Sequence, residues 1–278
     1  MLLLPVFLSA AGQQHKVGIV LSGGGALGFA HIGVLQALEE SGIRPTIIAG
    51  ASMGSLVGAL YASGMSPLEI YHVAKGNHFD HSSSILAPII KRGQLGISSQ
   101  KKVDQFLRVH LPHNSFDSLK LPLYVSVTNL TTNKSEFIST GDNLIPYLLA
   151  SSAIPVVFEA VEMDSMIYVD GGVLNNFPAQ AIRKKCRVLI GVDVTPNFED
   201  SDHLTGIIEM LGHTLHTLVH NNSIPGRQLC NHLIEPNFGK EYSVMSFKFF
   251  EEIYQHGYTV TKAYLAEHPS LVKQAKTN

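Results

Sequence analysis

The first sixty residues contain two buried-strand patterns, each followed by a helical pattern. Residues 16–21 (KVGIVL) form a β-branched apolar run that ends at a glycine cluster, and residues 46–49 (TIIA) form a second short run. After the first run, apolar positions within residues 30–38 recur on one helical face, and Gly42 predicts the end of that helix. After the second run, residues 56–61 continue a helical pattern. This order of strands and helices predicts a parallel sheet covered by helices.

The pattern is weaker between residues 65 and 120, where polar residues suggest a loop between helical pieces. We expect a lid or a substrate-facing insertion in this part of the chain. Beyond it, strand and helix patterns alternate again, so residues 15–278 are expected to form a single α/β domain. The strands are expected at residues 123–128, 136–139, 166–169 and 188–194, and the helices at residues 144–150, 204–219 and 247–265.

The composition allows a large core and argues against a nucleic-acid partner. Of the 278 residues, 45% are hydrophobic and 15% are charged, so the fold needs no metal or disulfide to hold it together. The formal net charge of -2 predicts no basic face for a phosphate backbone. Cys186 and Cys230 have no neighbouring Cys or His that would complete a metal site. We interpret both as core thiols, with a single disulfide as the alternative.

The N-terminal residues resemble a targeting segment. Residues 1–11 (MLLLPVFLSAA) are apolar and end in small residues before a polar stretch, as in a secretory signal peptide. No Lys or Arg precedes this run, so an apolar arm packed on the domain is the alternative for residues 1–14. The run is too short to span a bilayer as a helix. We expect an exported protein, with a cytoplasmic location as the alternative.

A candidate nucleophile lies in the turn after the second predicted strand. Residues 50–54 (GASMG) fit the G-x-S-x-G pattern, with a strand expected before the serine and a helix after it. Gly50 and Gly54 leave room for a strained turn and for a substrate carbonyl, and the helix directs its N-terminal dipole at developing negative charge. These features favour Ser52 as a nucleophile. A tight strand-to-helix turn without chemistry is the alternative.

A second glycine-rich turn, residues 22–28 (SGGGALG), joins the first predicted strand to the first predicted helix. Backbone amides in such a turn can converge on an anion or on the oxyanion of an acyl-transfer reaction. The candidate donors are the amides of Gly23, Gly24, Gly25 and Ala26.

The same turn also fits the G-x-G-x-x-G pattern of dinucleotide sites, through Gly23, Gly25 and Gly28. A dinucleotide-binding regulatory or redox domain is therefore the alternative function. Such a site requires Asp or Glu at the end of the second strand, where this chain has Ala51 and Ser52. The pair of turns favours a hydrolase, and no dinucleotide is expected.

For the base that a nucleophilic serine needs, the sequence offers a carboxylate. Asp170 ends an apolar strand and precedes Gly171 and Gly172, which predicts a carboxylate held at the carboxyl edge of the sheet. A free aspartate has a pKa of about 3.9, so the role requires surroundings apolar enough to raise that pKa. An aspartate that only forms a turn is the alternative.

Histidine gives no comparable candidate. His213, His216 and His220 share one face of a predicted helix, and by spacing alone they could bind a metal. No glutamate completes the spacing of a known zinc motif, so we interpret them as one side of a partly exposed helix and expect no metal.

The glycine-rich turn, the G-x-S-x-G turn and Asp170-Gly171-Gly172 stand in an order that resembles the patatin-like phospholipase family, including bacterial relatives of neuropathy target esterase. Residues 150–161 (ASSAIPVVFEAV) also look like that family, and the likeness extends from about residue 16 to about residue 265. The resemblance implies a three-layer α/β/α fold with a mostly parallel central sheet.

The resemblance also implies a Ser-Asp dyad that works without histidine, metal or other cofactor. Asp170 would take the proton of Ser52, the glycine-rich turn would hold the oxyanion, and water activated by Asp170 would hydrolyse the acyl-enzyme. The implied substrates are acyl esters of lipids, with peripheral membrane contact as a further expectation. Many relatives carry Arg or Lys where this chain has Leu27, which favours a neutral acylglycerol or simple ester. A lipid-binding protein without turnover is a weaker alternative, because Ser52 and Asp170 are both present.

Overall fold

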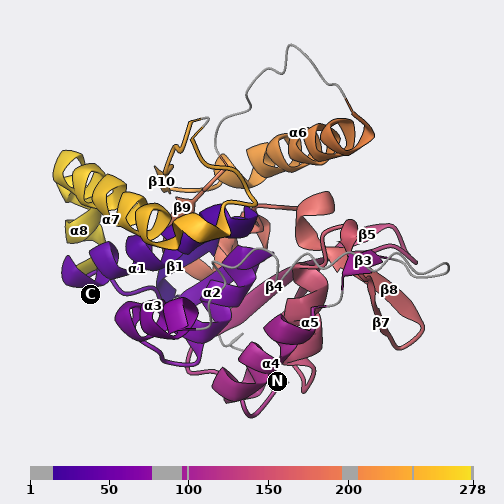
Figure 1. Ribbon diagram of the computed structural model, residues 1–278. Helices are drawn as coiled ribbons and strands as arrows, with labels where there is room; N and C mark the ends of the chain where they lie inside the picture. Colours follow the sequence, from indigo (N-terminus) through magenta and orange to yellow (C-terminus); the bar gives the residue numbers. More distant parts are fainter. Residues whose placement is uncertain (1–14, 77–95, 99, 196–205, 240, 277–278) are drawn as a thin grey trace, which may run out of the picture.

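A computed structural model describes residues 15–76, 96–98, 100–195, 206–239 and 241–276. In these residues the chain forms a central sheet with helices around it (Figure 1). The strands lie in the order β10-β9-β1-β2-β4-β8-β7, and β5 pairs with β4. Their bounds are β1 His15–Leu21, β2 Ile47–Ala51, β4 Leu123–Asn129, β5 Lys134–Ile138, β7 Val161–Met163, β8 Met166–Asp170, β9 Cys186–Val192 and β10 His232–Ile234. A separate pair consists of β3 (Gly96–Ser98) and β6 (Val156–Phe158).

The sheet is parallel from β10 to β4 and antiparallel beyond β4. The pairs β10–β9, β9–β1, β1–β2 and β2–β4 are parallel, whereas β8 and β5 run antiparallel to β4, and β7 runs antiparallel to β8. The expected α/β fold with a mostly parallel sheet is confirmed.

The two faces of the sheet are covered unequally. Alternate side chains of β1, such as Ile19 and Leu21, belong to a large core shared with most of the helices. Val20 points into a smaller core with Phe177 and Ile182, near the 3₁₀ turns η5 (Ala179–Ala181) and η6 (Arg183–Lys185). The helices are α1 Ala30–Glu40, α2 Met53–Ala62, α3 Pro67–Gly76, α4 Lys101–His110, α5 Leu144–Ser151, α6 Ile207–Arg227, α7 Phe250–Glu267 and α8 Pro269–Lys276.

Helix α6 differs most from its prediction. It continues to Arg227 rather than ending near residue 219, and it includes Pro225 in its last turn. The predicted first residues, 204 and 205, lie outside the described residues. The three-residue strands β3, β6, β7 and β10 were not predicted, because so short a segment shows no clear period of two.

Two predictions fall mainly on segments outside the description. The region predicted as a lid contains α3, β3 and α4, but residues 77–95 are not described, so the lid stays a prediction. Residues 1–14 are also outside the described residues, so export stays a prediction. None of the described helices is long and apolar enough to cross a bilayer.

Candidate active site

Two strands meet end to end along one edge of β4. Strand β5 pairs with residues 125–129 of β4 and occupies the other edge. On the shared edge, β2 pairs with β4 as far as Ala51 opposite Ser126, and β8 continues from Asp170 opposite Val127. Because β2 is parallel to β4 and β8 is antiparallel to it, the carboxyl ends of β2 and β8 face each other.

This junction brings Ser52 and Asp170 together. Ser52 directly follows β2, and Asp170 is the last residue of β8. The sequence predicts Asp170 at the edge where parallel strands end. In the structure Asp170 does lie at that edge, but its strand β8 runs antiparallel to β4. Strand β8 ends opposite Val127, next to the residue of β4 where β2 ends.

The backbone at Ser52 is strained. Ser52 has φ 49° and ψ −128°, a conformation that residues with a Cβ rarely adopt and that costs on the order of 1–3 kcal/mol. Close packing on both sides maintains it. A Cβ on Gly54 would overlap the carbonyl oxygens of Leu21 and Ser22, and a Cβ on Gly50 would overlap the backbone of Gly54. The two motif glycines therefore allow the first turn of α2 to lie against the end of β1.

A serine on α5 fixes the amide of Ser52. The Ser52 N–H donates to Ser151 Oγ at 2.9 Å, and Ser151 Oγ donates to the carbonyl oxygen of Ser126 on β4 at 2.7 Å. The turn is thus held from the helix α5 and from the sheet at the same time.

The Ser52 hydroxyl donates a hydrogen bond of 2.7 Å to Asp170 Oδ2. The other carboxylate oxygen, Oδ1, accepts from the Gly172 N–H at 2.7 Å, and the Asp170 N–H donates to the carbonyl oxygen of Ala153 at 2.9 Å. Ser52 and Asp170 are each only 6% exposed. The pair is a buried hydroxyl and carboxylate with both carboxylate oxygens fixed.

Burial raises the pKa of Asp170 to about 6, and the hydrogen bonds from Ser52 and Gly172 partly oppose that rise. This meets the requirement that the sequence placed on a carboxylate base, namely a site apolar enough to raise its pKa. Asp170 is still mainly ionised at neutral pH, yet it is a stronger base than an exposed aspartate.

The glycine-rich turn uses two of its four candidate amides elsewhere. The Gly23 N–H donates to Asn176 Oδ1 at 3.1 Å, and the Ala26 N–H donates to the carbonyl oxygen of Val244 at 2.8 Å. The amides of Gly24 and Gly25 donate to no group in the described part of the chain. Of the four amides that the sequence suggests as oxyanion donors, only those of Gly24 and Gly25 are therefore not already hydrogen-bonded within the described part of the chain.

The remaining motif glycines are sites of close approach. A Cβ on Gly28 would overlap the side chain of Met53, so this glycine lets the two motif turns pack together. A Cβ on Gly171 would overlap the Ser126 carbonyl, and a Cβ on Gly172 would lie 3.0 Å from Asp170 Oδ1. All three positions support the geometry of the pair.

Among the residues that the structure describes, no histidine hydrogen-bonds to Ser52 or Asp170. His31 is buried behind the glycine-rich turn, its Nε2 lies 2.8 Å from the carbonyl oxygen of Ser22, and burial lowers its pKa to about 4. His213, His216 and His220 lie on α6, and the described residues contain no group of three or more side chains able to hold a metal.

The two cysteines form no disulfide. Cys186 and Cys230 are both free, which corrects the disulfide alternative and leaves the interpretation as thiols.

The end of β2 lacks the carboxylate that a dinucleotide site needs there. Ala51 is buried at that position, and Ser52 begins the turn into α2.

Two polar residues at the site were missed by the sequence analysis. Asn176 is 1% exposed and binds the Gly23 amide, and Asn222 on α6 donates to the carbonyl oxygen of Gly172 at 2.8 Å. No pattern in the sequence marks either residue, because their partners lie 153 and 50 positions away along the chain.

The chain is similar to known proteins in sequence and in structure. Residues 19–182 match the family model described as patatin-like phospholipase, which covers both Ser52 and Asp170. The chain is 27% identical over 288 residues to Lysophospholipase nte1 of Aspergillus fumigatus, covering 90% of this chain and 18% of that protein. It is 35% identical over 179 residues to an uncharacterised NTE family protein of Mycobacterium tuberculosis, covering 64% of this chain and 49% of that protein.

A solved structure shares the fold. The crystal structure of VipD from Legionella pneumophila aligns with a TM-score of 0.52 at 17% identity, covering 92% of this chain and 68% of that one. The chain spans less than half the length of the curated relatives named above. The matched family model and the ordered motifs around the Ser52–Asp170 junction lead to one assignment: the chain belongs to the patatin-like phospholipase family.

Proposed function

We propose that this protein hydrolyses carboxylic esters of lipids, with Ser52 as the nucleophile and Asp170 as the base. The observation that carries the proposal is the 2.7 Å hydrogen bond from the Ser52 hydroxyl to Asp170 in a buried site. Membership of the patatin-like phospholipase family supports it, as do relatives named as lysophospholipases.

In the first half of the reaction, Asp170 accepts the proton of the Ser52 hydroxyl while Ser52 Oγ attacks the ester carbonyl carbon. The carbonyl oxygen becomes an oxyanion, and the amides of Gly24 and Gly25 are the proposed donors to it. When the tetrahedral intermediate collapses, the bond to the alcohol breaks and Asp170 returns the proton to the departing oxygen. Ser52 is left as an acyl ester.

In the second half, a water molecule replaces the alcohol. Asp170 takes a proton from that water as it attacks the acyl carbonyl, and the same two amides hold the second oxyanion. Collapse releases the carboxylic acid and returns the proton to Ser52 Oγ. One carboxylate therefore serves both halves, which is consistent with its pKa of about 6, because a base with a pKa near neutrality can both accept and return a proton.

The proposed substrates are neutral lipid esters. Leu27, which stands where many relatives carry Arg or Lys, is 7% exposed and packs in the main core. The glycine-rich turn thus directs no cation from this position at a phosphate headgroup. An acylglycerol or a simple long-chain ester fits better than a substrate recognised by its charge.

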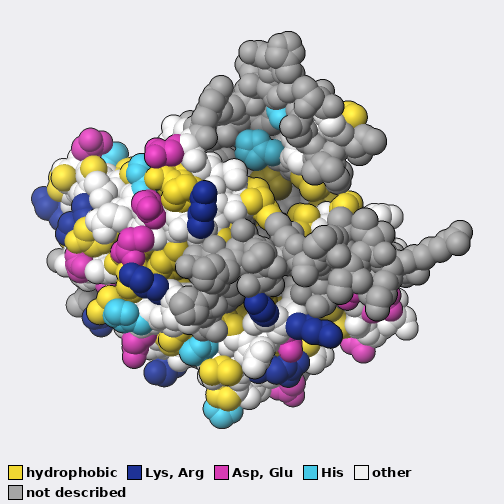
Figure 2. Space-filling view, viewed as in Figure 1, with side chains coloured by type: hydrophobic (Ala, Val, Ile, Leu, Met, Phe, Trp, Pro, Cys, Tyr) yellow, Lys and Arg dark blue, Asp and Glu magenta, His cyan; other side chains and the backbone are white. Residues whose placement is uncertain are grey.

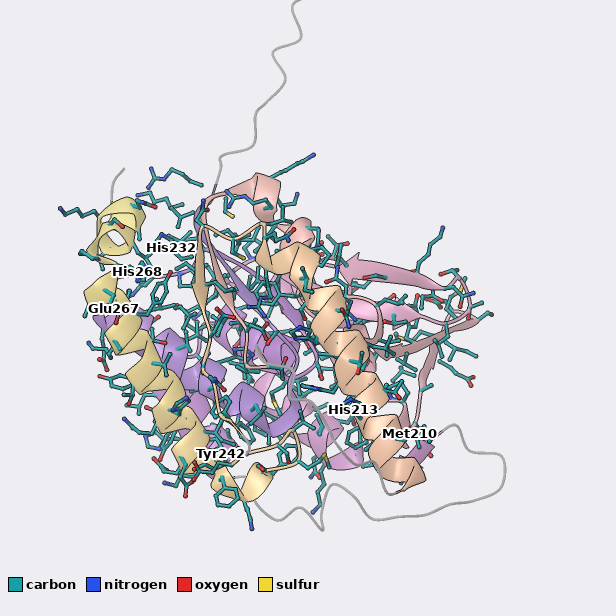
Figure 3. The ribbon with its side chains drawn as sticks, turned by 90° about the horizontal axis from the view of Figure 1, so that it is seen from above. Met210, His213, His232, Tyr242, Glu267 and His268 are labelled. Carbon is teal, nitrogen blue, oxygen red and sulfur yellow. The ribbon has the colours of Figure 1, made fainter. Side chains whose placement is uncertain are left out.

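We further propose that α6 and the residues after Gly172 contact lipid aggregates. Leu174, Met210 and Leu218 are large apolar side chains that are 43%, 53% and 45% exposed, and residues 210–226 include no Asp, Glu, Lys or Arg. Figure 2 shows apolar side chains gathered in the hollow beside α6, and Figure 3 shows Met210 and His213 near the N-terminal end of that helix. An exposed apolar surface without charged side chains can be buried against lipid with little loss of hydration energy.

Replacement of Met210 and Leu218 by glutamate is expected to weaken cosedimentation with phosphatidylcholine vesicles and to leave hydrolysis of a soluble short-chain ester unchanged. Val109→Glu on α4 is the matched control, since Val109 is 68% exposed on another surface. Equal loss of vesicle binding in the control, or none in the α6 variant, would argue against this contact.

The function is tested by hydrolysis of a medium-chain p-nitrophenyl ester, a monoacylglycerol and a lysophospholipid. Wild-type protein is compared with Ser52→Ala and Asp170→Asn, after circular dichroism confirms that all three fold. Loss of at least ~10³-fold in kcat is expected for both variants. Asp164→Asn, an exposed aspartate in the turn between β7 and β8, is the control and is expected to retain full activity.

A folded Asp170→Asn protein with full activity would remove the carboxylate from the mechanism. A wild-type protein without hydrolysis on any of the three substrates, but with saturable lipid binding, would favour a binding protein without turnover. Saturable binding of a dinucleotide would favour the alternative that the glycine-rich turn leaves open.

A further inference from the structure

Asn176 lies in the interior between the glycine-rich turn and the turn that follows Asp170. It is 1% exposed, and its carboxamide, its backbone N–H and its backbone carbonyl, which accepts from the Gly23 N–H at 3.4 Å, all have hydrogen-bond partners. Its Oδ1 accepts from the Gly23 N–H at 3.1 Å, its Nδ2 donates to Ser223 Oγ at 3.3 Å, and its backbone N–H donates to Asn222 Oδ1 at 2.8 Å. One carboxamide thus joins the glycine-rich turn to helix α6.

Asn222 continues this connection to the turn that follows Asp170. Its Nδ2 donates to the carbonyl oxygens of Gly172 at 2.8 Å and Val173 at 3.2 Å, while its Oδ1 accepts from Asn176. Gly172 is the residue whose amide donates to Asp170 Oδ1. Hydrogen bonds therefore link Gly23 to Asn176, Asn176 to Asn222, and Asn222 to the turn that fixes Asp170.

Helix α6 is held in place at its C-terminal end, so it can act as a rigid support. Arg227 pairs with Asp193 Oδ2 at 3.1 Å and also with Glu235, and Asp193 is almost fully buried at the end of β9. A Cβ on Gly226 would overlap the Phe177 carbonyl, which shows how closely the helix packs on the segment after Asn176. Figure 1 shows α6 as one continuous helix that extends away from this end.

We propose that Asn176 and Asn222 are positioning residues that hold the amides of the glycine-rich turn and the carboxylate of Asp170 in a fixed relation around Ser52. The inference rests on the proposed function and extends it to residues that contact no reacting atom. Electrostatic stabilisation of an oxyanion depends on donors that are already in place, and a misplacement of about 1 Å can lower a rate ~10²-fold. A hydrogen bond from Gly23 places the next amides, those of Gly24 and Gly25.

The first test is Asn176→Ala, which removes the side-chain acceptor of the Gly23 amide and leaves it only the longer contact of 3.4 Å to the backbone carbonyl oxygen of residue 176. A fluorophosphonate titrates the fraction of molecules with a reactive Ser52, and kcat is expressed per titrated site so that partial unfolding does not count. A decrease of ~10²-fold in kcat is expected with KM changed less than about threefold, because the lost interaction acts on the transition state.

Asn175→Ala is the matched control. Asn175 is the neighbouring residue in the same turn, and its carboxamide bonds only to Phe177 N–H and Gln180 in the described part of the chain. It is expected to keep wild-type kcat per site. A general effect of disturbing this turn would lower kcat in both variants alike and would overturn the proposal.

Asn176→Asp separates positioning from packing. The substitution keeps an oxygen that can accept from Gly23, so kcat at high pH is expected to recover to within about tenfold of wild type. It also places a second carboxylate near Asp170, which raises the pKa of Asp170, so the acidic limb of the kcat/KM profile moves to higher pH. A variant that recovers no activity relative to Asn176→Ala would contradict the proposal.

If Asn176→Ala does not fold, Asn222→Asp provides the decisive measurement. This half-buried side chain keeps its acceptor for the Asn176 amide and loses its donation to Gly172 and Val173, and a ~10-fold decrease in kcat per site is expected. Wild-type kcat per site in the folded variants would overturn the inference and leave the proposed function intact. An inactive wild-type protein without labelling of Ser52 would instead defeat the proposed function.

Discussion

Ser52 and Asp170 reach the same junction from opposite directions, and their two turns are constrained in different ways. Ser52 sits in a strained backbone conformation, with φ 49°, between glycines that permit close packing. Asp170 has a negative φ, so its backbone is not strained. Its cost to the stability of the fold is electrostatic, because burial disfavours the charged carboxylate and raises its pKa to about 6. The nucleophile is thus held by local chain geometry and the carboxylate by long-range pairing and burial.

This difference explains which parts of the site could be predicted from the sequence. The Ser52 turn is a local signal, because strand, serine, glycines and helix are consecutive in the chain. The position of Asp170 depends on the register of β8 with β4, which no local pattern specifies. Its location at the carboxyl edge was predicted, but the antiparallel direction of β8, which brings Asp170 to face Ser52, was not.

The supporting residues could not be predicted for the same reason. The contacts of Asn176 and Asn222 exist only where α6 packs against the segment that follows Asp170, and an isolated asparagine looks like any turn residue in the sequence. The narrowing of the oxyanion donors also required the structure, because Val244 accepts from Ala26 across more than two hundred residues of chain.

The largest effect is expected for Gly25→Ala in the glycine-rich turn, which packs against the turn of Ser52. Gly25 has φ +54°, and a Cβ there would overlap the Val244 carbonyl, so the glycine-rich turn must move. We expect kcat to decrease ~10²-fold or more through displaced oxyanion donors, together with a loss of about 1–3 kcal/mol in the free energy of unfolding.

Gly141→Ala is the control for that change. Gly141 also has a positive φ, of +93°, but nothing lies within 4 Å of its added Cβ. It should lose stability through backbone strain alone and retain wild-type kcat. If both variants had equal kcat, the glycine-rich turn would have no special role in the reaction.

The next effect concerns how much the buried charge of Asp170 lowers the free energy of unfolding. The folded-state pKa of Asp170 is above its unfolded value of 3.8, so the folded protein binds more protons between about pH 4 and 6 and this contribution to stability is lost as pH rises through that window. Asp170→Asn should therefore be more stable than wild type by about 2–3 kcal/mol at pH 8 and nearly equal to it at pH 4.

Urea unfolding at both pH values measures this difference, with Asp164→Asn as the exposed control. A stability gain that is the same at pH 4 and pH 8 would show that the carboxylate is not the source of the effect.

The smallest effect concerns the backbone of the nucleophile. Ser52→Gly removes the Cβ from a residue with φ 49°, so it should be more stable than Ser52→Ala by about 1 kcal/mol, although both variants are inactive. Thermal unfolding compares the two. Equal stability would mean that the turn at Ser52 carries no strain.

The pairing of Ser52 with Asp170 is tested most directly by the pH dependence of the rate at which a fluorophosphonate modifies the protein, followed by peptide mass mapping. The account predicts a single modification at Ser52 and a rate that rises with pH to a plateau, with a midpoint at about 6. In Asp170→Asn the rate should be at least ~10³-fold lower and lack that acidic limb. Modification at another residue, or the same profile and rate in Asp170→Asn, would contradict it.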